Sequence, residues 1–546
     1  MVLRYFLSLC VATQVHQMAC SGQLPKLVVV ISVDQFPYSY LTRFHQHFER
    51  GGFNYLIEHG AVFANATYKH ALNKTGPGHA TISTGCYGNQ NGIFANSWHD
   101  RESRRNLHCV EDRDAKPVGA ASGGASPVLL LSSTIGDELR LATGFRSKVI
   151  SVSLKDPAAV LLGGELANGV YWMVDSVFVS STYYMESLPK WVAEFNRMGL
   201  VNSFFGEIWE RFLPDSAYAI MDMDDAPYEA GGNGLGRTFP HRVSGENPST
   251  ITNSYYSAFR SSPFGNDVLA EFAKKAIQGE SLGKDEFTDL LFVGFSSNDY
   301  VGHMYGPNSH EVLDMTVRTD RVLADLLSFL DSDVGLDKCI IVLTSDHGVT
   351  PIPEYVLAHS KNTIAGRVNE RSIIDYGNAL LSIVFGKLEH GNTWIDYLDI
   401  GNLYLNRVVI AQKKLQFEDV VAVLADSLRA RKEVATLISR EEMLTLTPVS
   451  PIEQRMKRSF HRERSGDILF AYRPYFIDMS GNTGTTHGQP YEYDAHVPVI
   501  FFGGGIAKGI HYSDASPADI APTLSVLLGI GFPSGREGRV LVEALE

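Results

Sequence analysis

KLVVVISV, residues 26–33, is an unbroken apolar run that is rich in β-branched residues. Runs of this kind are typical of strands that are buried on both faces, as in parallel sheets. Helical patterns lie between several such runs, at about residues 38–59, 308–330 and 517–528. The alternation predicts an α/β protein with a mostly parallel central sheet flanked by helices. The runs that resemble the first are at residues 148–154, 289–296, 339–344 and 497–503.

Two stretches interrupt this rhythm, at about residues 157–285 and 350–480. The first is marked by aromatic residues, glycines and prolines, and the second contains a basic run at 455–464. We expect both to be insertions that form a cap over the sheet. The remainder then makes one large domain within residues 23–546, whose core is compatible with a chain that is 44% hydrophobic.

Residues 1–22 resemble a secretory signal peptide, because Arg4 precedes a short apolar run and small residues follow at 19–22. The run is too short to cross a bilayer, and no other apolar run reaches the roughly 18 residues that a span needs. We therefore expect no transmembrane segment and a periplasmic or secreted protein. Cys20, which follows Ala19, leaves a lipoprotein as an alternative.

Acidic residues outnumber basic ones, with 61 Asp and Glu against 47 Lys and Arg, for a formal net charge of −14. This balance argues against the basic surface that nucleic-acid binding needs, so we expect no nucleic-acid partner. The cysteines after residue 22 have no CxxC spacing, which makes a cysteine zinc site improbable. A bridge between Cys86 and Cys109, or free buried thiols including Cys339, both remain open.

Carboxylates and imidazoles recur where the predicted strands end, which is where ligands bind in open α/β sheets. A single Asp in such a place is more often a helix cap, and a lone His is more often structural. Three Asp and three His residues at the strand ends of one sheet are hard to explain as helix caps. They would suit two zinc-like ions with nitrogen and oxygen ligands. The residues are Asp34, Asp299 with His303, Asp346 with His347, and His487 just before the run at 497–503.

A second signal is LNKTGPGHATISTG, residues 72–85, in which Thr75 starts a short predicted helix. Free N–H groups and the positive end of the helix dipole favour a phosphate at this position. Thr75 could be an ordinary helix cap, but a nearby metal would make its hydroxyl a nucleophile. We interpret His79, four residues later, as structural rather than as a catalytic base.

Several segments together resemble the alkaline phosphatase superfamily, and most closely the PafA-type bacterial alkaline phosphatases. The resemblance runs in the right order over nearly the whole chain after residue 22. It implies a hydrolase with an alkaline-phosphatase-like catalytic domain, small phosphate esters as substrates and two Zn²⁺ ions per chain. The segments are VISVDQF, NKTGPGHATISTG, ANSWHD, SLKD, SSNDYVGH, TSDHG and TTHGQ.

The resemblance also implies a role for each matching residue. Thr75 would attack phosphorus and become phosphothreonine, while Asn96 and Lys155 would contact the phosphoryl group. The ligands of one zinc would be Asp34, Thr75, Asp346 and His347. Those of the other zinc would be Asp299, His303 and His487.

Pro157 is a departure from the family pattern, in which Lys-Asp is followed by arginine. The missing guanidinium should weaken the binding of a dianionic monoester more than that of a diester. A phosphomonoesterase is the leading hypothesis, and a phosphodiesterase or nucleotide pyrophosphatase on the same scaffold is the alternative. A cap residue such as Arg237 or Arg367 could replace the cation, although a surface or ion-paired role is favoured for both. A non-catalytic zinc-binding protein is disfavoured, because Thr75 and all the ligand residues are present.

Overall fold

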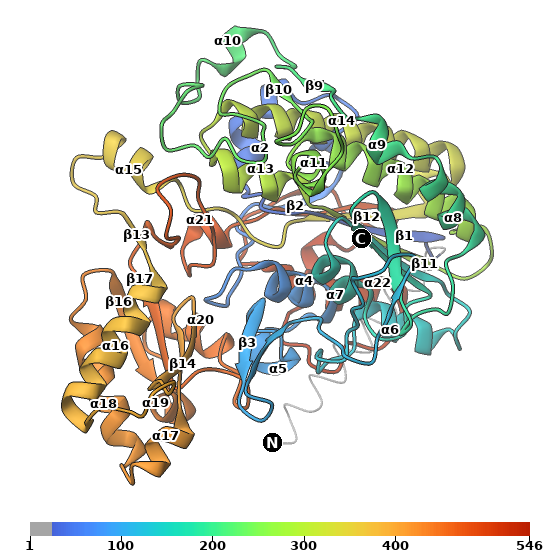
Figure 1. The fold of residues 1–546 in the computed structure, drawn as a ribbon. Helices are drawn as coiled ribbons and strands as arrows, with labels where there is room; N and C mark the ends of the chain where they lie inside the picture. The colour runs from blue at the N-terminus through green and yellow to red at the C-terminus, as the bar shows by residue number, and fades with distance from the viewer. Residues whose placement is uncertain (1–23) are drawn as a thin grey trace.

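The computed structural model describes residues 24–546, and its centre is a ten-stranded sheet (Figure 1). Strand β1 (Leu27–Val33) lies between β11 (Asp289–Phe295) and β12 (Cys339–Thr344), and both neighbours run parallel to it. Strand β6 (Val149–Ser153) continues the parallel set beyond β11. Every residue of these four strands is buried, as their apolar composition predicts. The predicted α/β fold class is therefore confirmed.

Antiparallel pairs occur on both sides of the four parallel strands, so the sheet as a whole is mixed. Strand β19 (Val499–Gly503) pairs antiparallel with β12, and β2 (Ala61–Phe63) pairs antiparallel with β19. On the other side β7 (Gly169–Val174) is parallel to β6, and β8 (Val177–Ser181) turns back along it. Because β19 runs opposite to β12, its first residues lie beside the carboxyl end of β12. The direction of β19 thus brings the segment before it to the edge where ligands bind.

Helices cover both faces of the sheet, because successive side chains of each strand point to opposite faces. On one face Val29 and Ile31 of β1 join a core that includes α12 (Pro263–Glu280) and α14 (His310–Asp333). On the other face Val28 and Val30 join a core with α6 (Ile135–Ala142) and α22 (Ile520–Leu528). Figure 1 shows the first pair above the strands and the second pair below them. Within residues 24–546 no helix is long and apolar enough to cross a membrane.

The predicted helix at 38–59 is wrong as a single helix, while the other two predicted helices are present. That at 308–330 is α14, and that at 517–528 is a 3-10 turn, η4 (Pro517–Asp519), followed by α22, with Ser516 as the N-cap. Between 38 and 59 the chain breaks near Gly51 and Gly52, where the Asp320 carboxylate accepts hydrogen bonds from the backbone N–H groups of Glu49 and Phe53. The pieces are α2 (Ser39–Arg43), η2 (His45–His47) and α3 (Phe53–His59).

The stretches predicted as insertions are built differently from each other. Residues 157–285 are divided between layers, since β7 and β8 extend the central sheet and α12 packs on its face. Residues 350–480 contain a separate four-stranded sheet with its own core, seen in orange in Figure 1. Its strands are β14 (Ile395–Asp399), β15 (Asn402–Leu405), β16 (Val434–Ser439) and β17 (Ile468–Tyr472), and α16 (Glu370–Phe385) and α18 (Phe417–Arg429) pack on them. We call this part the small domain.

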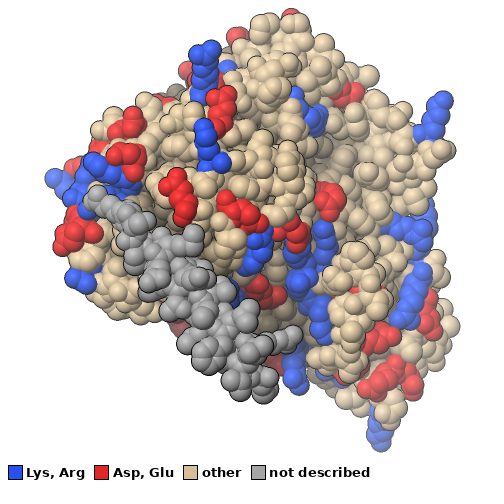
Figure 2. Space-filling model, turned by 180° about the vertical axis from the view of Figure 1, so that it is seen from behind, with Lys and Arg blue, Asp and Glu red and all other residues tan. Residues whose placement is uncertain are grey.

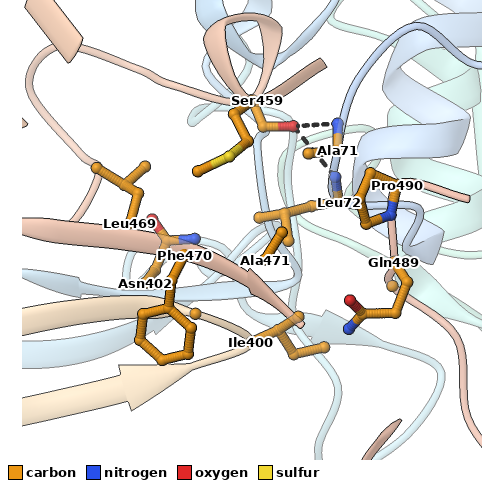
Figure 3. A pocket seen from close by; sticks show the side chains of 13 residues that line it. Ala71, Leu72, Ile400, Asn402, Ser459, Leu469, Phe470, Ala471, Gln489 and Pro490 are labelled. Carbon is orange, nitrogen blue, oxygen red and sulfur yellow. Dashed lines mark hydrogen bonds between the residues drawn. The ribbon is translucent and has the colours of Figure 1, made fainter. Parts of the chain in front are cut away.

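The small domain is hydrogen-bonded to the chain just before Thr75. The Ser459 hydroxyl accepts hydrogen bonds from the N–H groups of Ala71 and Leu72, at 2.8 and 3.1 Å (Figure 3). A cavity of about 20 Å³ beside this contact is lined by apolar side chains that include Ile400 and Phe470. The contact fixes the segment that leads into the predicted nucleophile.

Cys86, Cys109 and Cys339 are free and buried, so the alternative of a bridge between the first two is wrong. The predicted signal peptide, with Cys10 and Cys20, lies outside the described residues. Figure 2 shows Lys and Arg interspersed with Asp and Glu on the back of the molecule.

Candidate active site

A cleft of about 470 Å³ opens at the carboxyl edge of the central sheet. Asp34, Asp346 and His347 lie nearby and are completely buried. The structure therefore brings together every residue that the sequence singled out as catalytic or metal-binding. The predicted residues that line the cleft itself are Thr75, Asn96, Lys155, Asp299, His303 and His487.

The carboxylates converge because they follow three adjacent parallel strands. Asp34 follows β1, Asp346 follows β12, and Asp299 lies in the first turn of α13 (Ser297–Tyr305) after β11. Gln35 connects them, since its N–H donates to Asp346 Oδ1 at 3.0 Å and its side-chain amide donates to Asp299 Oδ1 at 2.8 Å. The loop after β12 also bends, so that His347 Nε2 lies 3.1 Å from Asp346 Oδ2. Both residues of that pair can therefore reach one ion.

Three imidazoles surround Asp299 and are held in one orientation. The Nε2 atoms of His303, His487 and His347 lie 3.3, 3.6 and 4.0 Å from Asp299 Oδ1. Each Nδ1 is hydrogen-bonded to a backbone carbonyl, which turns Nε2 towards the carboxylate as the nitrogen that can bind a metal. Burial and the two neighbouring imidazoles also hold the pKa of His487 well below its usual value. The carbonyls belong to Thr485, Asn73 and Gly348, at 2.8, 2.7 and 2.9 Å.

The side chains form two groups whose ligand atoms lie within 4.8 Å of one another. Several of these buried atoms have no hydrogen-bond partner among residues 24–546. A buried carboxylate or imidazole without a partner is costly, and a bound cation would remove that cost. Carboxylate and imidazole donors in this number suit divalent metals such as zinc, so the site fits metal ions. One group is Asp299, His347 and His487, and the other is Asp34, His79 and Asp346. The atoms without a hydrogen-bond partner include both Asp34 oxygens, Asp346 Oδ2, His79 Nε2 and His347 Nε2.

His79 was interpreted as structural from the sequence, and the structure places it among the carboxylates. Its Nε2 lies 3.3 Å from Asp34 Oδ1, and its Nδ1 is 2.9 Å from the Thr75 carbonyl. Burial alone would lower the pKa of His79, but the carboxylates of Asp34 and Asp346 raise it above its usual value. The signal that could have shown this proximity is the spacing of four residues from Thr75 on one helix.

Lys155 is the cation nearest the carboxylates. Its ammonium lies 2.5 Å from Asp299 Oδ2 and 3.6 Å from Asp34 Oδ2, and 4.8 Å from the centre of the Tyr300 ring. Burial alone would lower the pKa of Lys155, but Asp299 and Asp34 raise it above its usual range. For the same reason the pKa of Asp299 lies well below its usual value despite burial. Lys155 is therefore positively charged throughout the neutral and alkaline range.

Thr75 is the first residue of α4 (Thr75–Thr84) and is 6% exposed. A Cβ at Gly78 would lie 2.2 Å from the backbone oxygen of Asp346, so glycine there lets the helix pack on the ligand loop. The N–H of Gly76 donates to Asn96 Oδ1 at 2.8 Å. The NH₂ group of Asn96 is then left as a donor at the cleft, close to the start of α4.

Pro157 lies in the first turn of α7 (Asp156–Gly163) and lines the cleft, so position 157 faces the site. Neither of the substitute cations that we considered is available. Arg237 is paired with Asp225 at 2.7 Å, and Arg367 is paired with Glu354 at 2.8 Å. Both arginines are ion-paired, which was the favoured interpretation.

Comparisons with known proteins show which family this chain resembles. The family model for type I phosphodiesterase / nucleotide pyrophosphatase matches residues 28–491. The alkaline phosphatase PhoV of Synechococcus elongatus is 36% identical over 533 residues, which cover 96% of this chain and 93% of that protein. The alkaline phosphatase PafA of Elizabethkingia meningoseptica is 35% identical, over 95% of this chain and 94% of that protein.

Solved structures show the same fold. A crystal structure of wild-type alkaline phosphatase PafA superposes with a TM-score of 0.90 at 34% identity, covering 96% of this chain and 100% of that one. A murine ectonucleotide pyrophosphatase / phosphodiesterase 5 superposes with a TM-score of 0.53 at 16% identity, over 94% of this chain and 96% of that one. At that identity the second likeness concerns the fold alone.

Proposed function

The chain belongs to the type I phosphodiesterase / nucleotide pyrophosphatase family and is a hydrolase of the alkaline phosphatase type, and we propose that it hydrolyses phosphate monoesters with two zinc ions and Thr75 as the nucleophile. The observation that carries the proposal is the set of buried carboxylate and imidazole atoms that have no hydrogen-bond partner, next to a threonine at a helix start. Such atoms cost stability unless cations occupy the site.

Each residue has a place in this scheme. We assign Asp34, Asp346, His347 and Thr75 to one zinc, and Asp299, His303 and His487 to the other. When bound, the two ions supply Lewis acidity that lowers the pKa of hydroxyl groups and offsets charge on the entering and leaving oxygens. His303 is assigned with Asp299, which its Nε2 approaches to 3.3 Å. His347 lies within reach of both carboxylates, and we assign it with Asp346 because its Nε2 is 3.1 Å from Asp346 but 4.0 Å from Asp299.

The chain's own groups then carry out a double displacement. Thr75 Oγ gives its proton to solvent and forms a bond to phosphorus, while the ester oxygen leaves with its electron pair and takes up a proton from solvent. The oxygen of a water molecule next forms a bond to phosphorus, the Thr75–phosphate bond breaks, and Thr75 Oγ regains a proton as inorganic phosphate is released. The NH₂ of Asn96 and the ammonium of Lys155 stabilise the phosphoryl oxygens throughout, together with the positive end of the α4 dipole.

Monoesters are the proposed substrates because the two curated relatives described above, PhoV and PafA, bear the name alkaline phosphatase. Pro157 favours the alternative, a phosphodiesterase or nucleotide pyrophosphatase. The test is the kcat/KM of the zinc-loaded protein for p-nitrophenyl phosphate and for bis-p-nitrophenyl phosphate at alkaline pH. We expect the monoester to be preferred. A preference for the diester would reject the proposal in favour of the alternative.

A further inference from the structure

Arg260 is a cation of the cleft that the sequence did not single out. It ends α11 (Asn253–Arg260) and lines the cleft together with Lys155, Pro157 and Tyr300. It is half-buried. Among the arginines within residues 24–546 that are at least partly buried, Arg260 alone makes neither a hydrogen bond nor an ion pair to the described chain. A partly desolvated guanidinium without a partner is costly, and an anionic ligand would remove that cost.

The turn that carries Arg260 is fixed against the catalytic segments. It leads into α12, and Asn266 near the start of α12 donates from its side chain to Asn298 Oδ1 at 2.8 Å. Asn266 also accepts from the N–H of Ser297 at 3.2 Å. Asn298 and Ser297 belong to α13, the helix that carries Asp299. The position of Arg260 is thus tied to that of a predicted metal ligand.

The same turn also packs against the segment that carries Lys155. A Cβ at Gly265 would lie 3.2 Å from Leu154 Cδ1 and 3.5 Å from the carbonyl oxygen of Phe259, the residue before Arg260. Phe259 is completely buried, and its carbonyl also accepts a hydrogen bond from the Ser262 hydroxyl at 2.7 Å. Arg260 therefore reaches the cleft from a rigid turn, next to the segment in which Pro157 follows Lys155.

Three cations line the cleft, and they are Lys74, Lys155 and Arg260. The ammonium of Lys155 already has a counter-charge in Asp299, at 2.5 Å. Arg260 supplies the one guanidinium among the described residues that line the cleft, and this guanidinium has no partner in residues 24–546. A guanidinium presents paired donors that match the oxygens of a phosphoryl group, and its charge acts more strongly on a dianion than on a monoanion.

We propose that Arg260 binds the phosphoryl group of a monoester dianion and takes the place of the arginine that Pro157 replaces. The proposal rests on the monoesterase function proposed above. It assigns the preference for monoesters to α11, a helix outside the metal-binding part of the site. It also explains why a chain with proline at position 157 can retain that preference.

The test compares Arg260→Met and Arg260→Lys with the wild-type protein, using p-nitrophenyl phosphate and bis-p-nitrophenyl phosphate. Loss of a charge-assisted interaction should lower kcat/KM for the monoester roughly 10- to 100-fold, while the diester changes by less than about threefold. Inhibition by inorganic phosphate should weaken in parallel, and Arg260→Lys should recover part of both effects. The matched control is Arg237→Gln, which removes another cation of the same insertion away from the cleft and should change neither rate.

Zinc content and Tm are measured for every variant, so that the comparison uses folded, zinc-loaded protein. An equal loss of kcat/KM for both substrates, or no loss for either, would overturn the role of Arg260. A wild-type preference for diesters would reject the monoesterase function instead. In that case a selective loss of the monoester rate in Arg260→Met would still support the role of Arg260, so the two failures are distinguishable. If Arg260→Met does not fold, unchanged phosphate inhibition in Arg260→Lys together with unchanged monoester selectivity would reject the proposal.

Discussion

The two sides of the cleft position their charges by different means. On the sheet side, Asp34, Asp299 and Asp346 lie at the ends of adjacent parallel strands, and the register of the sheet brings them together. On the helical side, Lys155 and Arg260 come from the starts and ends of helices, and their positions depend on how α7, α11 and α12 pack. The sheet side is thus a direct product of the fold. On the helical side, the side chains of Pro157 and Arg260 make no hydrogen bond or ion pair to the metal ligands, so either can change without disturbing them, whereas Lys155 is bound to Asp299.

We infer that the sheet side carries the metal ions and the chemical step, and that the helical side determines the selectivity between substrates. Changes on the sheet side should abolish turnover or metal binding for every substrate. Changes on the helical side should alter the ratio between substrates and leave the metal content intact. The predictions below test that separation, from the largest expected effect to the smallest.

Thr75→Ala should lower turnover at least about 10⁴-fold for monoesters and diesters alike, because it removes the attacking oxygen. Zinc content should be retained, since the carboxylates and imidazoles remain. The measurement is steady-state kinetics on protein whose zinc has been determined by elemental analysis. Thr75→Ser is the matched control, because it keeps a hydroxyl at the start of α4 and should retain much of the activity. A zinc-loaded Thr75→Ala protein with substantial activity would exclude Thr75 as the nucleophile.

Asp299→Ala and His487→Ala should each lower the zinc content by about one ion per chain and activity by at least about 100-fold. Asp299 is the more sensitive position, because three imidazoles and Lys155 all face its carboxylate. Elemental analysis after gel filtration gives the stoichiometry. His359→Ala, at an exposed histidine, is the control and should keep the wild-type content. An unchanged zinc content in the first two variants would refute these ligand assignments.

Pro157→Arg should raise the selectivity for monoesters over diesters about tenfold, because position 157 lines the cleft and a second guanidinium would face the phosphoryl group. In the double variant, arginine at position 157 should also reduce the loss of monoester kcat/KM that Arg260→Met causes. The ratio of the two kcat/KM values measures both effects. The backbone is expected to tolerate the change, since arginine is as compatible with the first turn of a helix as proline. A selectivity that is the same with and without arginine at 157 would mean that this position does not contact the phosphoryl group.

The sheet side of the cleft could be predicted from the sequence to a greater extent than the helical side. That the strand-end residues lie together could be predicted, because a buried apolar run shows where a strand ends and parallel strands end at one edge. The departure at Pro157 was also visible. What the sequence could not show was that Arg260 lies across the same cleft, because that depends on hydrogen bonds between α12 and α13.

Other differences from the prediction have equally local causes. The break in the predicted helix at 38–59 depends on the Asp320 carboxylate, which comes from α14 and binds backbone N–H groups far away in sequence. The position of His79 beside Asp34 depends on how closely α4 packs on the ligand loop. The antiparallel direction of β19 cannot be read from an apolar run, although it is what brings His487 to the cleft. Each of these requires a contact between segments that are distant in sequence.

The smallest predicted effect is the pH dependence of stability, and it lies on the sheet side. Burial alone would lower the pKa of His347, but the carboxylates of Asp346 and Asp299 raise it above its usual value. In the metal-free protein the folded state therefore binds this proton more tightly than the unfolded state does. The stabilisation is complete below the unfolded pKa of about 6.5 and is lost as the pH rises through the folded pKa.

The expected observation is a difference in Tm between the metal-free wild-type protein and His347→Gln that depends on pH. It should amount to a few degrees at about pH 6 and shrink towards about pH 9. With zinc present the trend should reverse, because the metal competes with the proton for Nε2 and binds less tightly as the pH falls. A difference in Tm that stays constant across this range would mean that His347 is not protonated in the folded metal-free protein. The carboxylates of the sheet side would then not be acting on His347 as the geometry requires.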